Sequence, residues 1–240
     1  MSTFVIVHGA WGSPAEMEPV VEPLEAAGHA VVIVDLPCVD AGATLEHYAA
    51  AVRAVLPDDP ADVVLVGHSF GGFTVSTIAA ENVGMSVAYV AAWVPRPGAS
   101  VIDLFFGRDP FVDGEEAGLA AFGGLVASAG AGRCALGIDR LVAAADPSER
   151  DATRSYLERT QRPQGIAALR QKWKGDLPIS GRLIYILTAA DKLVPPQAQR
   201  AMAASVGAKI VEIDTGHSPF GEQPGRLAEL LLAGSLHKTP

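Results

Sequence analysis

The chain has 240 residues, and a hydrophobic content of 49% is ample for the core of one domain, or of one domain with an inserted subdomain. A net charge of −9 opposes binding to nucleic acid or anionic membranes, and no apolar run approaches the roughly 18–20 residues of a membrane-spanning helix. The N-terminus enters an apolar run without a basic leader segment, so we expect a cytoplasmic protein.

Six short apolar runs predict strands. Most are continuous runs of Val, Ile and Leu rather than alternating ones, which is typical of a parallel sheet covered on both faces. Right-handed crossovers between alternating strands and helices predict a doubly wound, mostly parallel α/β sheet. The predicted strands are Thr3–Val7, Ala30–Val34, Asp62–Val66, Ser86–Ala91, Leu183–Thr188 and Lys209–Ile213.

Three helix starts carry capping signals, and in one of them, Asp146-Pro147-Ser148-Glu149, the aspartate is the expected cap. Ser13 is followed by Pro14 at the first helical position and by Glu16 three residues after the cap, which is the pattern of a capping box. Thr44 is expected to open a helix that runs towards Leu56.

The alternation of predicted strands and helices stops after Val94 and resumes at Gly181. Residues 1–94 and 179–240 are therefore predicted to form the core, and residues 95–178 an inserted helical cap over the carboxyl ends of the strands. A long disordered linker is the alternative, but apolar residues in this segment keep helical spacing. The expected cap helices are Ile138–Ala145, Pro147–Thr160 and Gln164–Trp173.

The most informative motif is Gly-His-Ser-Phe-Gly at residues 67–71, between an apolar run and a helical run. Ser69 on such a tight turn is expected to have a strained backbone, which usually persists only where function needs it. Gly67 and Gly71 stand where a Cβ would collide with the bend. The pattern matches the nucleophile elbow of α/β-hydrolases, although a glycine-rich turn after a strand can also lack any chemistry. A P-loop is excluded because no Gly-Lys-Ser/Thr follows.

A serine nucleophile needs a base, and the base needs a carboxylate that fixes its tautomer. His217 follows the last predicted strand and is the candidate base. Asp191 follows the fifth strand and is the candidate acid, since the order Ser69, Asp191, His217 is the one expected of this fold. Asp214 is a rival for the acid, but it lies on the strand end that carries His217 and would have to fold back.

The oxyanion of such a reaction needs two preorganised N–H donors. The elbow supplies the backbone N–H of Phe70 at the start of its helix, and the loop after the first strand supplies that of Ala10, because Gly9 lets the backbone approach the serine. His8 and His68 are expected to be structural.

Further segments extend the resemblance to the α/β-hydrolase superfamily: Val7-His8-Gly9-Ala10-Trp11, Gly28-His29-Ala30-Val31 and Asp35-Leu36-Pro37. The branch that the chain resembles is that of small carboxylesterases similar to plant methylesterases and hydroxynitrile lyases. The likeness covers about Phe4–Val94 and Leu183–Leu232, and hardly the cap. It implies Ser69, Asp191 and His217 as the triad, with Ala10 and Phe70 as oxyanion donors.

Three positions depart from that branch. Hydroxynitrile lyases carry a threonine where this chain has Gly9 and a lysine where it has Ser218, so the departures favour hydrolysis. Cys38 stands where a glycine is usual. With Cys134 it makes the only two cysteines, and we expect both to be free thiols.

The expected function is hydrolysis of a small or medium neutral carboxylic ester through an acyl-enzyme, without cofactor or metal. Partners other than the substrate are not expected, and the chain is taken to be a monomer or homodimer. Aromatic residues of the cap and elbow could line an apolar pocket. The same triad also serves lactonases, C–C and amide hydrolases, perhydrolases and hydroxynitrile lyases, and a small-molecule receptor on this scaffold stays open. The candidate substrate-binding residues are Trp11, Phe105, Phe106 and Trp173, with Phe70, Phe111 and Phe122 beside them.

Overall fold

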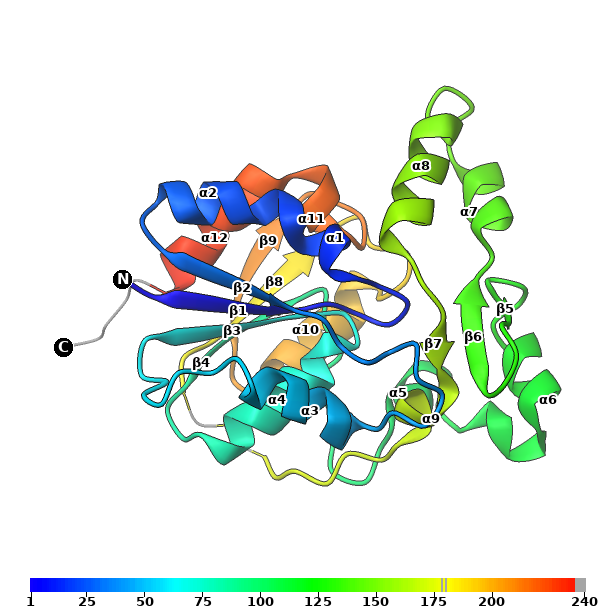
Figure 1. Cartoon of the computed structure of the whole chain (residues 1–240), viewed down its shortest axis with the longest axis horizontal. Coiled ribbons are helices and arrows are strands. Elements are labelled where there is room, and N and C mark those ends of the chain that lie inside the picture. The colour runs from blue at the N-terminus through cyan, green and yellow to red at the C-terminus, as the bar shows by residue number, and fades with distance from the viewer. Residues whose placement is uncertain (178, 180, 236–240) are drawn as a thin grey trace.

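A six-stranded parallel sheet forms the centre of the computed structural model, which describes residues 1–177, 179 and 181–235 (Figure 1). Its strand order is β2-β1-β3-β4-β8-β9, and every neighbouring pair is parallel. The chain winds outwards in one direction from β1 and in the other from β3, so the crevice between the carboxyl ends of these two strands is a topological switch point. The strands are β1 (Thr3–Val7), β2 (Ala30–Val34), β3 (Val63–His68), β4 (Ser86–Val90), β8 (Leu183–Thr188) and β9 (Lys209–Ile213).

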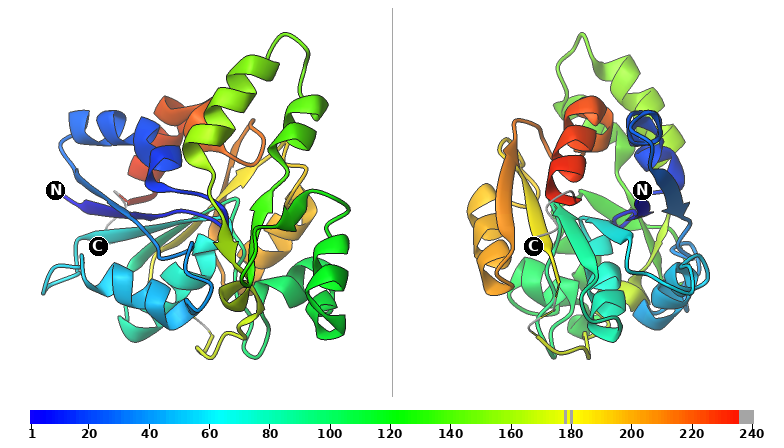
Figure 2. Two further views of the ribbon diagram at one scale, coloured as in Figure 1. Left: turned by 45° about the vertical axis from the view of Figure 1, so that its right-hand side comes forward. Right: turned by 90° about the vertical axis from the view of Figure 1, so that its left-hand side faces the viewer.

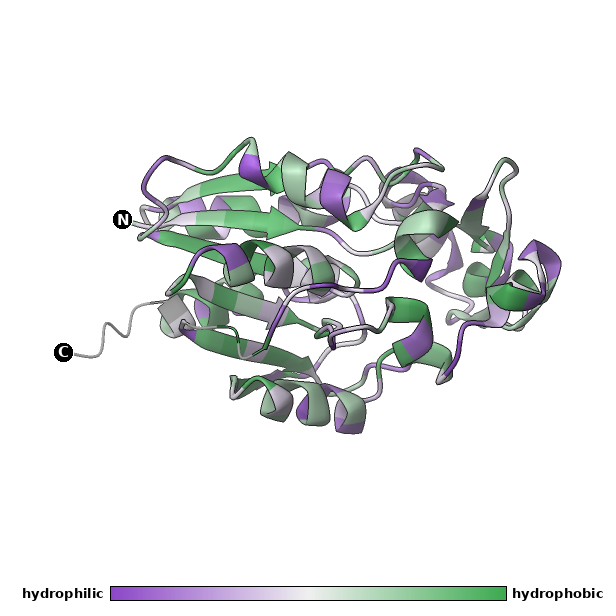
Figure 3. Cartoon of the chain, turned by 90° about the horizontal axis from the view of Figure 1, so that it is seen from below, coloured by the Kyte–Doolittle hydropathy of each residue, from purple (hydrophilic) through white to green (hydrophobic). Residues whose placement is uncertain are grey.

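Helices cover both faces of this sheet, as the predicted doubly wound fold requires (Figure 1). One face carries α1 (Pro14–Met17), the 3₁₀ helix η1 (Glu18–Val20), α2 (Val21–Ala26), α11 (Pro219–Glu222) and α12 (Pro224–Ser235). The other carries α3 (Leu45–Arg53), α4 (Gly71–Glu81) and α10 (Pro196–Ser205). The strands stand out as hydrophobic in Figure 3, and two hydrophobic clusters fill the two interfaces between sheet and helices.

The predicted strands agree closely with the structure, and the fold class is confirmed. Four of the six have the predicted bounds, whereas β3 runs on to His68 and β4 ends at Val90. All six residues of β3 are buried, which explains why an unbroken apolar run marked it so clearly.

The segment between β4 and β8 stands at one end of the sheet, away from the N-terminus (Figures 1 and 2). Besides helices it contains a three-stranded antiparallel sheet in the order β5-β6-β7, which the sequence did not predict. Its elements are α5 (Val101–Phe106), the 3₁₀ helix η2 (Pro110–Asp113), α6 (Glu115–Ala120), β5 (Val126–Ser128), β6 (Arg133–Leu136), α7 (Ile138–Ala144), α8 (Arg150–Thr160), β7 (Gln164–Gly165) and α9 (Ile166–Arg170).

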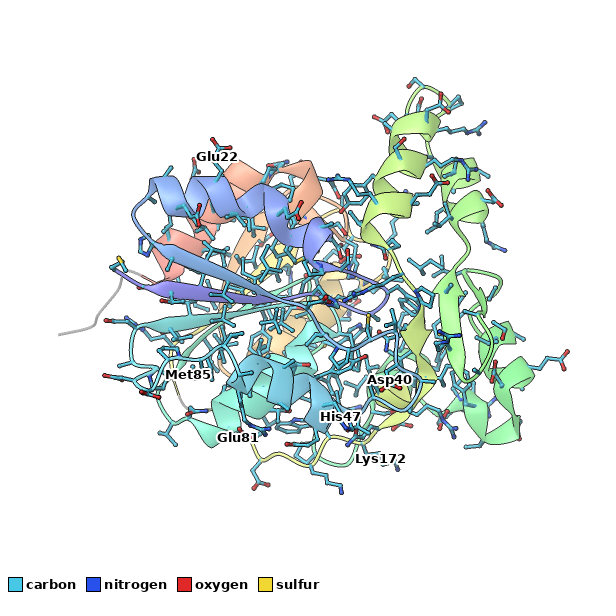
Figure 4. The ribbon with its side chains drawn as sticks, in the orientation of Figure 1. Glu22, Asp40, His47, Glu81, Met85 and Lys172 are labelled. Carbon is cyan, nitrogen blue, oxygen red and sulfur yellow. The ribbon has the colours of Figure 1, made fainter. Side chains whose placement is uncertain are left out.

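The single helix predicted for Gln164–Trp173 is therefore wrong, since a short strand comes first and the helix covers only Ile166–Arg170. Gly165 explains the difference. Its N–H donates to the carbonyl oxygen of Cys38 at 2.7 Å, and a Cβ on it would stand 2.5 Å from the carbonyl oxygen of Asp40. Asp40 is labelled beside this segment in Figure 4. Contact with the loop at residues 38–40 thus prevents the helix that the local pattern favours.

Two predicted helix caps also differ from the structure. The carboxylate of Asp146 accepts the N–H of Ser148 in a turn, and α8 begins only at Arg150. Ser13 does precede α1, but its hydroxyl donates to the carbonyl oxygen of Thr160 at 2.8 Å instead of capping the helix. The Thr44 cap is present as predicted, with α3 beginning at the next residue.

Cys38 and Cys134 are both buried and free, as predicted. In the part of the chain that the structure describes, none of the helices combines the length and the apolar character needed to span a bilayer.

Candidate active site

Ser69 lies on the sharp turn between β3 and α4, at the switch point of the sheet. Its φ of +50° is in the left-handed region, which costs a non-glycine residue about 1–3 kcal/mol. The surrounding glycines make this turn possible. A Cβ on Gly71 would stand 2.6 Å from the carbonyl oxygen of Val7, and one on Gly9 would stand 2.8 Å from the Cβ of Ser69. The loop after β1 can therefore lie directly against the serine.

The structure brings Ser69, His217 and Asp191 together in one hydrogen-bonded line. Nε2 of His217 lies 3.0 Å from Oγ of Ser69, and Nδ1 of His217 lies 2.8 Å from Oδ2 of Asp191. A carboxylate can only accept, so Nδ1 carries the proton and Nε2 is free to accept the serine hydroxyl. This is the arrangement of a nucleophile, a base and an orienting acid.

The carboxylate of Asp191 is buried and held by several donors. Its Oδ1 accepts the backbone N–H groups of Leu193 and Val194 at 2.8 and 2.9 Å, and its Oδ2 accepts the hydroxyl of Thr188 and the amide of Gln199. Burial by itself raises the pKa of this carboxyl, but the hydrogen bonds from His217 and the backbone outweigh it and leave the pKa lowered. Asp191 therefore stays ionised beside the imidazole.

Asp214, the rival for the acid, is exposed, and its carbonyl oxygen accepts the amide of Gln223. Within the described residues its carboxylate makes no hydrogen bond to His217. The geometry thus favours Asp191 over Asp214.

The loop after β1 forms a turn beside the serine. Gly12 donates to the carbonyl oxygen of Gly9 at 3.3 Å, and Trp11 has a φ of +60°. The backbone N–H groups of Ala10 and Phe70 donate no hydrogen bond within the described part of the chain. Both residues line the cavity above Ser69, so both donors are free to serve a group bound there.

His8 and His68 make structural hydrogen bonds, as predicted. Nδ1 of His8 donates to the carbonyl oxygen of Gly9, and its Nε2 accepts the N–H of Leu36. Burial, helped by the charge of Arg162 and opposed by the Gly9 hydrogen bond, lowers the pKa of His8 to about 4. Nε2 of His68 lies 2.8 Å from the carbonyl oxygen of His217 and fixes that loop.

A cavity of about 160 Å³ opens above Ser69, between the core and the inserted segment. Most of its wall is apolar. Of the four candidate substrate-binding residues, Trp11 and Phe105 line it, and Phe122 joins them through a stacked contact with Phe105 at 6.0 Å.

The other two candidates do not line this cavity, and their assignment is corrected. Trp173 is buried against α4, where its indole N–H donates to Thr77 at 3.0 Å. Phe106 packs behind the wall, edge-on to Phe105 and Phe122. Phe105 follows Val101 and Ile102 by four and three residues and lies on the face of α5 that these residues turn to the cavity, whereas Phe106 does not line it.

One end of the cavity is polar, and the sequence analysis did not anticipate it. Glu16, Tyr156 and Ser218 line this end, close to His217. The sequence pattern had placed Glu16 in a capping box, but its side chain is 4% exposed and turned inwards. Only the tertiary structure reveals the inward orientation of Glu16, because the capping pattern predicts a side chain that turns back to the N-cap of its own helix.

Arg162 is a further residue that sequence reasoning missed. Its guanidinium ties the inserted segment to the loops after β1 and β2 through the carbonyl oxygens of Gly12 and Leu36, Nε2 of His8, and an ion pair with Asp35. It thereby fixes the loop that presents the Ala10 N–H.

Among the described residues no group of three or more His, Cys, Asp or Glu side chains is placed to hold a metal ion.

Comparison with known proteins assigns the family. The model of the alpha/beta hydrolase family matches residues 4–230. The chain belongs to this family. A curated relative, the carbendazim hydrolyzing esterase of Nocardioides sp. (strain SG-4G), is 27% identical over 97% of this chain and 99% of its own. A solved structure of a polyneuridine aldehyde esterase mutant is similar at a TM-score of 0.73 and 25% identity, covering 97% of this chain and 98% of that one.

A methylesterase from Arabidopsis shares the fold at a TM-score of 0.70 and 21% identity, over 97% of this chain and 98% of its own. The predicted resemblance to the esterase branch that includes plant methylesterases is confirmed by these matches. They also confirm the prediction of a carboxylesterase-type hydrolase at the level of enzyme class.

Proposed function

We propose that this alpha/beta hydrolase cleaves small or medium neutral carboxylic esters through an acyl-enzyme on Ser69. The observation that carries the proposal is the hydrogen-bonded line from Oγ of Ser69 to Nε2 of His217 at 3.0 Å and from Nδ1 to Asp191 at 2.8 Å. A hydroxyl at such a distance from a neutral imidazole can lose its proton as it attacks a carbonyl.

In the first half of the reaction, Oγ of Ser69 bonds to the ester carbonyl carbon while Nε2 of His217 takes the hydroxyl proton. The resulting imidazolium is stabilised by Asp191, which stays ionised for the reasons given above. His217 then gives the proton to the alkoxide oxygen as the carbon–oxygen bond breaks, and the alcohol leaves. In the second half, His217 takes a proton from water, which attacks the acyl-enzyme and releases the acid.

The negative charge that develops on the carbonyl oxygen would be held by the free N–H groups of Phe70 and Ala10. One such donor is worth about 3–4 kcal/mol of barrier. The ion-paired Arg162 and the turn at Gly9 hold the Ala10 loop in place before substrate arrives. The donors therefore need little reorganisation.

The cavity supports an ester of limited size with an apolar acyl group. Its wall beside Ser69 is formed by Phe105, Phe122, Leu136 and other apolar side chains. The relative from Nocardioides is named an esterase, which supports ester hydrolysis by this chain too. A hydroxynitrile lyase is less well supported, because Ser218 uses its hydroxyl to donate to Glu16 and no lysine stands there.

Hydrolysis of p-nitrophenyl acetate and butyrate tests the proposal. The wild-type protein should release p-nitrophenol with saturation kinetics, and Ser69→Ala should remove turnover while leaving the circular dichroism spectrum unchanged. If the folded wild-type protein neither turns these esters over nor reacts with a fluorophosphonate, a receptor on this scaffold becomes the better assignment.

A further inference from the structure

The polar end of the cavity holds a buried carboxylate without a basic partner. The Glu16 side chain is 4% exposed and lines the cavity. Its Oε1 accepts the hydroxyl of Ser218 at 2.8 Å, and among the described residues its only ion-pair contact is Nδ1 of His68 at 3.8 Å. A carboxylate taken out of water without a cation is costly, so such a group usually has a partner.

His68 does not supply that cation. Burial lowers its pKa, and the proximity of Glu16 only partly offsets this, so the ring is neutral near pH 7. Nε2 of His68 faces the carbonyl oxygen of His217. Because a carbonyl oxygen can only accept, Nε2 carries the ring proton. Nδ1 is then an acceptor without a hydrogen-bond partner, buried next to the acceptor oxygen of Glu16. Two acceptors that face each other leave room for a donor.

Tyr156 adds a third unpartnered group to the same end. Its hydroxyl is buried and has no hydrogen-bond partner among the described residues, although the residue lines the cavity. Burial, and after it the charge of Glu16, raises its pKa, so it remains a neutral hydroxyl. A Cβ on Gly12 would stand 2.7 Å from Oε2 of Glu16, so this glycine leaves the space that the carboxylate occupies.

This acceptor-rich end lies on the His217 side of Ser69. Ser218 follows His217 directly, and the rings of His68 and His217 are 4.9 Å apart. His217 must reach the oxygen of the departing alcohol in order to protonate it. The alcohol part of an ester, rather than its acyl part, therefore points towards Glu16.

We propose that Glu16, with Nδ1 of His68 and the hydroxyl of Tyr156, binds an ammonium group on the alcohol part of the substrate. The ammonium group supplies both the hydrogen-bond donor and the positive charge that this end of the cavity lacks. The substrate class is thus an ester of a short amino alcohol with an apolar acyl group. This inference rests on the proposed esterase activity and adds the choice of leaving group. The net charge of −9 also favours a cationic ligand.

Two esters of one acyl group test the proposal, the acyl group being the one that gives the fastest p-nitrophenyl ester turnover. The 2-(dimethylamino)ethyl ester is protonated at pH 7 and carries an N–H donor, whereas the 3-methylbutyl ester has nearly the same shape without charge. We expect kcat/KM to be about tenfold or more higher for the ammonium ester, the size of a charged hydrogen bond. A ratio near one would overturn the proposal.

Glu16→Gln keeps the shape and an acceptor for Ser218 but removes the charge. It should lower the ratio at least about fivefold, chiefly by slowing hydrolysis of the ammonium ester. Tyr156→Phe should lower the ratio in the same direction. Glu46→Gln, at an exposed position of α3, is the matched control and should leave the ratio unchanged. If Glu16→Gln slows both esters equally, Glu16 only positions the His217 loop and the proposal is wrong.

Binding to Ser69→Ala separates this inference from the esterase proposal. Calorimetry on this variant should give a lower Kd for the ammonium ester than for the 3-methylbutyl ester, and Glu16→Gln in the same background should remove the difference. If that preference is found although the wild-type protein hydrolyses neither ester, the esterase proposal fails and the ammonium site stands. Equal Kd values would reject the ammonium site.

Discussion

Nε2 of His217 lies 3.0 Å from Oγ of Ser69, although 148 residues separate them in the chain. The parallel sheet makes this contact possible, because β3 and β9 end at the same edge and deliver the residues that follow them to one crevice. The strained backbone at Ser69, with φ of +50°, holds its hydroxyl at that crevice.

Asp191→Asn should lower kcat for p-nitrophenyl butyrate by about 10³–10⁴-fold, because an amide no longer holds the imidazole in the working tautomer or stabilises its charged form. Steady-state kinetics at pH 7 measures the effect. Asp214→Asn is the matched control and should keep kcat within a factor of about three, since its carboxylate is exposed and away from His217. The reverse result would make Asp214 the acid.

Gly71→Ala should lower the free energy of unfolding by about 2 kcal/mol or more, because the new methyl group would stand 2.6 Å from a carbonyl oxygen of β1 that cannot move freely. Activity should fall with it, since the same glycine allows the elbow to form. In Gly225→Ala the methyl group meets nothing within 4 Å. That helical control should be neutral or more stable by up to about 1 kcal/mol in urea denaturation. Equal effects of both changes would contradict the packing argument.

The lowered pKa of His8 should make the free energy of unfolding depend on pH. The pKa of His8 is lowered from 6.5 to about 4 in the folded state, chiefly by burial. Between these pH values the unfolded chain binds a proton that the folded chain does not, so the free energy of unfolding falls as the pH falls from 6.5 to 4. The contribution is about 3 kcal/mol in total.

Urea denaturation at pH 7, 5.5 and 4.5 measures this slope. The variant His8→Asn should be less stable at pH 7, because the contacts with Leu36 and Arg162 are weakened. Its stability should nevertheless change less between pH 7 and pH 4.5 than that of the wild-type protein. An unchanged slope would mean that His8 does not stay neutral.

Phe122→Ala should enlarge the cavity and shift the preferred acyl chain of p-nitrophenyl esters to longer lengths, since Phe122 lines the cavity and stacks on Phe105. A series from acetate to decanoate measures the shift. Trp173→Phe is the comparison, because Trp173 lies outside the cavity and contacts Thr77. This variant loses the hydrogen bond to Thr77 but should keep the wild-type optimum. A shift in Trp173→Phe alone would place Trp173, and not Phe122, at the acyl-binding wall.

The core could be predicted because its local signals and its tertiary contacts agree. The run before Ser69 is apolar and fully buried in β3, and the bounds of β1, β2, β8 and β9 follow from similar runs. The contact between Ser69 and His217 followed from the rule that parallel strands end together, combined with the glycines around the serine.

The inserted segment could not be predicted to the same extent, because distant contacts decide its structure. Gly165 donates to the carbonyl oxygen of Cys38 and ends a short strand where the local pattern favoured a helix. Arg162 reaches across to Asp35 and Gly12, which no local pattern indicates. Glu16 fitted a capping box in the sequence, yet it turns inwards because Ser218 approaches it from the far end of the chain.

The covalent step on Ser69 is the central claim, and trapping it is the most direct test. The protein is quenched in acid during turnover of p-nitrophenyl butyrate, digested, and analysed by tandem mass spectrometry. We predict a butyryl group on the peptide that contains Ser69, at the Ser69 oxygen, and its absence in Ser69→Ala. A butyryl group on another residue, or full turnover by Ser69→Ala, would contradict the account.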